Sequence, residues 1–173
     1  MTAPAGVRAE HLTLADVVSD RLQRLHRLWA LRRGKRRWPA YAEFAGEDFA
    51  FIAGTISLVD VLRAPVRFRM RRIGASIEEL RGPGDQGKMV EEIEPKPYAE
   101  LPRRHYAAAV EGGEPLFHLV QFLPGVRPAR FPLAYERAIL PLSGDGDAVD
   151  MLLIGSDWSE AITSDLRKFH EGG

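Results

Sequence analysis

A single turn constrains the fold of this 173-residue chain more than any other stretch. The four residues from Gly144 to Asp147 read Gly-Asp-Gly-Asp, and apolar segments lie on both sides of them, at Leu133–Leu142 and Val149–Gly155. An Asp-Gly pair between two apolar strands is a strong local signal for a β-hairpin. We therefore predict that these two segments form an antiparallel hairpin, which requires a sheet to receive it.

Three further segments have strand character. Phe51–Leu62 is rich in aromatic and β-branched residues and stops before Pro65, and Leu116–Phe122 has a similar composition. Between them, Val66, Phe68 and Met70 alternate with Arg67, Arg69 and Arg71. Because successive side chains of a strand point to opposite faces, this alternation predicts a strand with one apolar face and one basic face.

Helical periodicity separates these strands. We predict a helix over residues 13–34, which Thr13 begins and Gly34 ends, a short helix around Ile77–Leu80, and a longer helix from Tyr98 to Val110. Pro102 is expected in the first turn of the longer helix, where a missing amide is tolerated. The chain is therefore α+β.

The order of these elements resembles the PAS domain, and most closely a bacterial subfamily of short stand-alone PAS proteins with a leading helix. The resemblance spans roughly residues 20–157 and depends on order and spacing. The Gly82–Gly87 loop departs from it by being unusually rich in Gly and Pro. The stretches that carry it are Trp29–Arg37, Phe68–Gly74, Gly87-Lys88 followed by Glu91-Glu92, and Pro141–Gly146.

The resemblance implies a five-stranded antiparallel sheet with helices on one face. It divides the chain into a flexible N-terminus (1–12), an amphipathic helix (13–34), a PAS-like domain (35–157) and a C-terminal tail or short helix (158–173). It also implies a sensory or adaptor module in bacterial signal transduction, which acts by binding a ligand or a protein partner and is not an enzyme.

The composition of the chain excludes several kinds of chemical site. The chain has no cysteine, which excludes disulfides, thiolate metal sites and cysteine nucleophiles. Lys and Arg number 24, as do Asp and Glu, so net charge gives no reason to expect a nucleic-acid partner. No apolar run approaches the length of a bilayer-spanning helix and no secretory signal begins the chain, so we expect a cytoplasmic protein without a membrane partner.

Motifs that could hold a cofactor are weak, and we expect none. Gly82–Lys88 has the spacing of a phosphate-binding loop, but Met89 occupies the position of the magnesium-binding hydroxyl and a helix precedes the loop. No two histidines have the spacing of metal ligands. His105 lies where some PAS domains place a haem-binding histidine, but arginines precede it, and we expect a colourless protein.

Two groups of residues are the candidate sites. Strand alternation and helix phase select a set that would line a ligand cavity. The second group is an apolar stripe along the first predicted helix, whose spacing suits packing on another helix and predicts a homodimer. The alternative is a monomer whose helix folds back on its own sheet. The cavity set is Phe68, Met70, Ile77, Tyr106, His118, Val120 and Met151, and the dimer stripe is Val18, Leu22, Leu25 and Trp29.

Two other functions stay open. A small enzyme could use His105 or His118 as a general base near Glu114. A binder of anionic surfaces, either nucleic acid or membrane, could use the basic Arg32–Arg37 cluster, although cations at a helix end also face the negative end of the helix dipole. The sequence identifies neither the ligand nor the protein partner.

Overall fold

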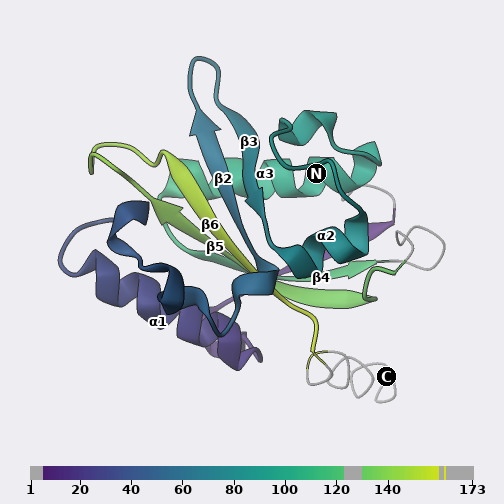
Figure 1. Cartoon of the computed structure of the whole chain (residues 1–173), viewed down its shortest axis with the longest axis horizontal. Coiled ribbons are helices and arrows are strands. Elements are labelled where there is room, and N and C mark those ends of the chain that lie inside the picture. The colour runs from purple at the N-terminus through teal and green to yellow at the C-terminus, as the bar shows by residue number, and fades with distance from the viewer. Residues whose placement is uncertain (1–5, 123–129, 160–161, 163–173) are drawn as a thin grey trace.

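The computed structural model describes residues 6–122, 130–159 and 162, and consists of one antiparallel sheet with helices on both faces (Figure 1). The six strands lie in the order β1-β4-β5-β6-β2-β3. The predicted α+β class, the antiparallel sheet and the final β5–β6 hairpin are confirmed, whereas the sheet has six strands and not five. The elements are β1 (Val7–Leu12), α1 (Asp20–Arg33), β2 (Ile56–Leu62), β3 (Arg67–Ile73), α2 (Ala75–Arg81), α3 (Lys96–Gly112), β4 (Leu116–Phe122), β5 (Ala134–Leu142) and β6 (Met151–Asp157).

The sixth strand is β1, which forms where the sequence predicted a flexible N-terminus. It pairs with β4 in antiparallel register from Val7 opposite Phe122 to Leu12 opposite Phe117. Without β1, the backbone groups along one side of β4 would form an open sheet edge. The strand is therefore stabilised by its partner more than by its own sequence, which contains few large apolar residues.

The first helix begins later than predicted. Thr13 and Asp16 do form a capping pair, but it closes the short 3-10 turn Leu14–Asp16, with Thr13 Oγ1 donating to Asp16 Oδ2 at 2.6 Å. The α-helix starts at Asp20, because Ser19 Oγ accepts a hydrogen bond from the Leu22 amide at 3.1 Å and caps the first turn. The predicted end at Gly34 is confirmed.

Two other boundaries also differ from the prediction. Strand β2 begins at Ile56 and not at Phe51, because a short 3-10 turn occupies Ala53–Thr55. Helix α3 begins at Lys96, so Pro102 lies inside the helix and not in its first turn. The C-terminal segment predicted as a tail lies mostly outside the described residues.

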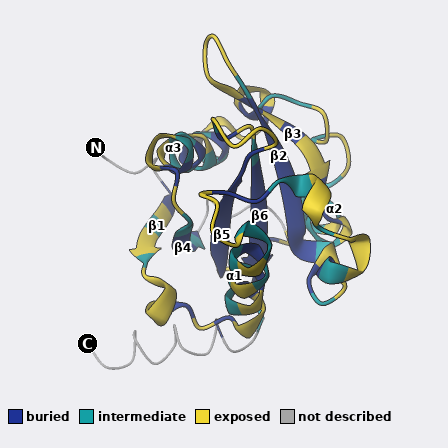
Figure 2. Cartoon of the chain, turned by 90° about the vertical axis from the view of Figure 1, so that its left-hand side faces the viewer, coloured by how far each residue is buried: buried dark blue, intermediate teal, exposed yellow. Residues whose placement is uncertain are grey.

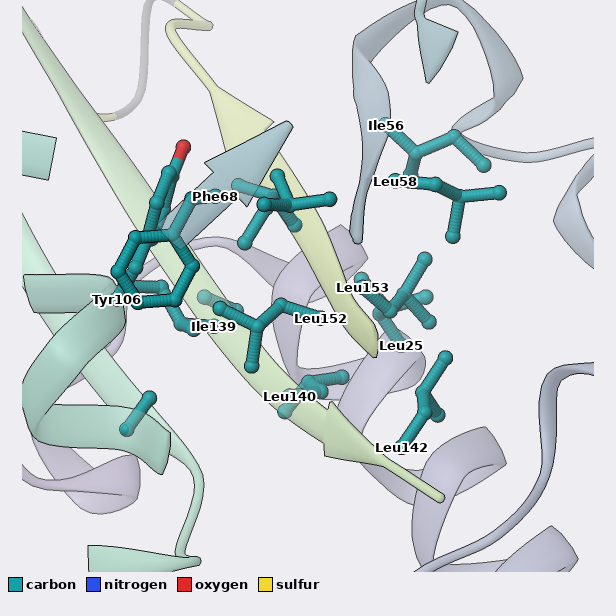
Figure 3. Close-up of a cluster of buried hydrophobic side chains, with 14 of the residues drawn as sticks. Leu25, Ile56, Leu58, Phe68, Tyr106, Ile139, Leu140, Leu142, Leu152 and Leu153 are labelled. Carbon is teal, nitrogen blue, oxygen red and sulfur yellow. The ribbon is translucent and has the colours of Figure 1, made fainter. Parts of the chain in front are cut away.

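The sheet separates two layers of helix (Figures 1 and 2). Alternation along β5 and β6 sends Leu140 and Leu153 toward α1, and sends Ile139 and Leu152 toward α3. Figure 3 shows this division, with Phe68 and Tyr106 on one side of the strands and Leu25 on the other. Both faces of the central strands are therefore buried, and every residue of β5 is buried.

The apolar stripe of α1 packs on the chain's own sheet. Leu22 and Leu25 are completely buried and Trp29 is 2% exposed, whereas Val18 is 42% exposed. The Trp29 indole Nε1 donates to the Pro141 carbonyl at 2.8 Å. The predicted dimer stripe is thus mostly covered within one chain, as in the fold-back alternative, and these three side chains could meet a second copy only if α1 left the sheet. The predicted homodimer itself stays a prediction.

Among the described residues, no helix combines the length and the apolar character that crossing a membrane requires.

Candidate ligand-binding cavity

A cavity of about 80 Å³ lies between the sheet and the helical segment that joins β3 to β4. Helices α2 and α3 form one wall, which includes Ile77, Leu80, Tyr98, Ala99 and Tyr106. The strands form the opposite wall, which includes Met70, Ile73, Tyr135 and Ile154. Phe131, Pro132 and Trp158 complete a lining that is mainly apolar.

A row of polar side chains crosses the cavity side of the sheet. His11 on β1 pairs with His118 on β4, which pairs with Arg137 on β5, which in turn pairs with Ser156 on β6. Because directly paired residues of neighbouring strands share a face, these four side chains follow one line across the sheet. Arg137 and Ser156 line the cavity, and Ser57 on β2 joins them there.

His105 extends this row from helix α3. Its ring stacks on His118 with the ring centroids 3.8 Å apart and the planes 7° apart, and Arg137 Nη2 donates to His105 Nδ1. Burial, together with the nearby Arg137 charge, lowers the pKa of His105 to about 3 and that of His118 to about 2. Both imidazoles are therefore neutral at physiological pH.

Arg137 is consequently a buried cation without a described acidic partner. The residue is 3% exposed, its Nε has no hydrogen-bond partner, and no described carboxylate forms an ion pair with it. Its neighbour Glu136 faces the other side of the sheet, where its carboxylate accepts from the Val18 and Ser19 amides. Burial of an unpaired charge is costly, so Arg137 is the most unusual group in the cavity wall.

A second arginine at the cavity is neutralised. Arg81 on α2 forms an ion pair with Asp85 at 2.7 Å, and both side chains are largely buried. The Arg81 guanidinium also lies over the Tyr98 ring, 4.4 Å from its centroid. Burial raises the pKa of Tyr106 to about 12 and also raises the pKa of Tyr135, so both hydroxyls keep their protons. The described lining therefore has one net positive charge, on Arg137.

The residues predicted from the sequence divide into two groups. Met70, Ile77 and Tyr106 line the cavity. Phe68 lies behind the cavity and packs edge-to-face against Tyr106, with the two ring centroids 5.6 Å apart. His118 belongs to the polar row. Val120 packs in a smaller apolar cluster, and Met151 begins β6 opposite Leu142, far along the strand from Ser156.

Sequence reasoning missed Arg137, Ser57, Ser156 and Tyr135, which line the same cavity. A signal for Arg137 was present, because it occupies the same strand face as Tyr135 and Ile139, whose large side chains favour burial of that face. A charged residue in such a position is either paired or functional.

The other candidate motifs have local structural partners. The Gly82–Gly87 loop follows helix α2, and Lys88 Nζ forms an ion pair with Asp85 at 3.3 Å. Within the described ranges, no cluster of His, Asp or Glu could hold a metal ion. In the basic cluster, Arg32 pairs with Asp48 at 2.8 Å and Arg36 pairs with Glu43 at 2.5 Å.

Comparison of the chain with protein-family models and with curated proteins gave no match.

Proposed function

We propose that this chain is a PAS-type sensory or adaptor module of bacterial signal transduction, which binds a small molecule between its sheet and helices α2 and α3. The order of elements supports the proposal. After α1, two strands are followed by a helical segment and then by three strands, and all five strands belong to one antiparallel sheet. The resemblance to PAS domains predicts this order of strands and helical segment, although the sheet here has a sixth strand, β1.

The cavity is the observation that carries the proposal. It is lined mainly by apolar side chains and contains a few convergent polar groups, which is the usual composition of a small-molecule site. A sensory module requires such a site but needs no catalytic group. The wall combines rigid strands with the separate helix α2, so a ligand would contact both kinds of element.

The enzyme alternative receives less support from the geometry. A general base works best when its pKa lies near the operating pH. The pKa values of His105 and His118 are far below that range, and Glu114 is exposed ahead of β4. The anionic-surface alternative is also weaker, because Arg32 and Arg36 are paired and Arg37 lies over the Trp38 ring.

Thermal unfolding with a panel of small neutral, cationic and anionic compounds would test the proposal. Ala99 lines the cavity from α3, whereas Ala108 on the same helix is exposed. We expect at least one compound to raise the melting temperature of the native chain and of Ala108→Leu. The same compound should have no effect on Ala99→Leu, because the larger side chain occupies the cavity.

Native mass spectrometry of freshly purified protein provides a second measurement, since a tightly bound molecule would add mass that denaturation removes. The proposal is wrong if no molecule is retained and no compound of any charge stabilises the native chain.

A further inference from the structure

We propose that the cavity recognises a small monocarboxylate with a short apolar body, and that the Arg137 guanidinium binds its carboxylate. This inference rests on the proposed ligand-binding function and adds the chemical class of the ligand. The inference is based on a buried guanidinium that has no described acidic partner and lies beside apolar cavity walls.

Arg137 has unused hydrogen-bonding capacity in the cavity. A guanidinium has five N–H donors in a planar fork, and the described contacts of Arg137 comprise one bond to His105 Nδ1, with Nε unpartnered. That partner is a neutral ring, so it accepts a hydrogen bond without balancing the charge. A carboxylate matches the fork with two parallel bonds and would supply the missing negative charge.

The charge of the site favours a monoanion. Arg81 at the cavity is already paired with Asp85, and the hydroxyl groups of Tyr106, Ser57 and Ser156 are neutral donors. One carboxylate would therefore leave the site neutral. A phosphate dianion would leave one negative charge without a partner against apolar walls, which is unfavourable.

The size of the cavity limits the ligand. A cavity of about 80 Å³ is far below the roughly 300–1,000 Å³ of sites that hold drug-sized molecules, so it favours a small ligand. The series from butanoate to hexanoate, with about six to eight non-hydrogen atoms, represents ligands of this class. Met70, Ile73 and Ile154 provide the apolar surface for the chain.

Titration calorimetry of the full chain with pentanoate and with pentanamide would test the charge requirement. The two compounds have nearly the same shape and size, and only the first carries a negative charge. We expect saturable binding of pentanoate and at least about thirtyfold weaker binding of pentanamide, because the amide leaves the buried guanidinium charge unpaired. Inorganic phosphate is included as a second anion and should not compete.

Arg137→Met removes the charge and keeps the apolar stem. Arg8→Met makes the same change at an exposed position of β1 and serves as the matched control. Pentanoate should bind the control as it binds the native chain and should bind Arg137→Met at least about thirtyfold more weakly. If Arg137→Met does not fold by circular dichroism, Arg137→Lys, which keeps the charge but lacks the fork, should bind more weakly than the native chain.

Equal affinity for pentanoate and pentanamide would overturn the inference, and so would undiminished binding of pentanoate by folded Arg137→Met or competition by phosphate at equal concentration. Stabilisation of the native chain by neutral compounds alone would overturn the carboxylate inference and leave the sensory proposal standing. Absence of binding by every compound, whether neutral or charged, would refute both.

Discussion

Substitution of Gly155 by Ala tests whether α1 lies on its own sheet. A Cβ atom at Gly155 would lie 2.6 Å from Leu25 Cδ2 and 3.0 Å from Leu22 Cδ2. Both leucines are fully buried, so their ends have no solvent-filled space into which they can move. Overpacking of this kind costs about 1–3 kcal/mol, and the reduced entropy of the unfolded chain offsets about 0.4–1 kcal/mol. We expect the free energy of unfolding to fall by about 1–2 kcal/mol.

Urea unfolding followed by circular dichroism measures this loss, and a double-mutant cycle identifies its cause. Leu25→Ala alone should cost about 2–5 kcal/mol. In the Gly155→Ala, Leu25→Ala double variant, the new methyl group enters the space that Leu25 vacated. The loss of unfolding free energy in the double variant should therefore be smaller than the sum of the two single losses, by at least about 0.5 kcal/mol.

Gly46→Ala is the control, because a Cβ there has no neighbour within 4 Å, and it should change stability by less than about 0.5 kcal/mol. A fully stable Gly155→Ala variant, or strictly additive effects in the cycle, would refute this account. Helix α1 would then not cover β6 in solution, and its apolar stripe would be free to pair two chains.

Two further predictions concern other parts of the fold. Gly74→Ala should destabilise the fold more strongly than Gly155→Ala, by at least about 3 kcal/mol in urea unfolding. The new Cβ atom would lie 2.4 Å from the Gly54 carbonyl oxygen, and backbone atoms cannot rotate away. A loss below about 1 kcal/mol would contradict this packing. Stability should also fall as the pH is lowered from 7 to 5. Unfolded histidines take up protons near pH 6.5, whereas the pKa values of about 3 for His105 and about 2 for His118 keep the folded rings neutral. The slope should reach roughly 1 kcal/mol per pH unit per histidine and should be shallower in His118→Phe, and an unchanged slope in that variant would disprove the assignment.

Local patterns predicted the parts of the fold that local physics determines. Leu116–Phe122 was predicted as a strand with the bounds that the structure shows, and the alternation of apolar and basic residues correctly assigned the faces of β3. The Asp-Gly turn likewise located the β5–β6 hairpin. In each case the information that determines the local structure is present in consecutive residues.

Long-range contacts determined what the sequence did not predict. An apolar stripe requires a cover, but it does not indicate whether a second chain or the same chain supplies it. Here Gly155 leaves room on β6 for Leu22 and Leu25, and Pro141 offers a carbonyl to Trp29, although Gly155 and Pro141 are both over 100 residues away from α1 in the sequence. Strand β1 likewise depends on the free edge of β4, which no property of Val7–Leu12 reveals.

The same alternation links the candidate cavity to the first turn of α1. Glu136 and Arg137 are consecutive in β5 and point to opposite faces, as Ser156 and Asp157 do in β6. On the cavity side, Arg137 and Ser156 line the candidate ligand site. On the other side, Glu136 accepts from the Ser19 amide at 2.8 Å, and Asp157 accepts from Ser19 Oγ at 2.5 Å.

The ends of two neighbouring strands thus hold the ligand-facing groups and the α1 cap in adjacent residues. A ligand can shift the position of a structural element only if it binds the two arrangements with different affinity. Binding at Arg137 that moves β5 relative to β6 would move Glu136 relative to Asp157, and both carboxylates hold Ser19. The N-terminal turn of α1 is therefore connected to the cavity wall through Glu136 and Asp157.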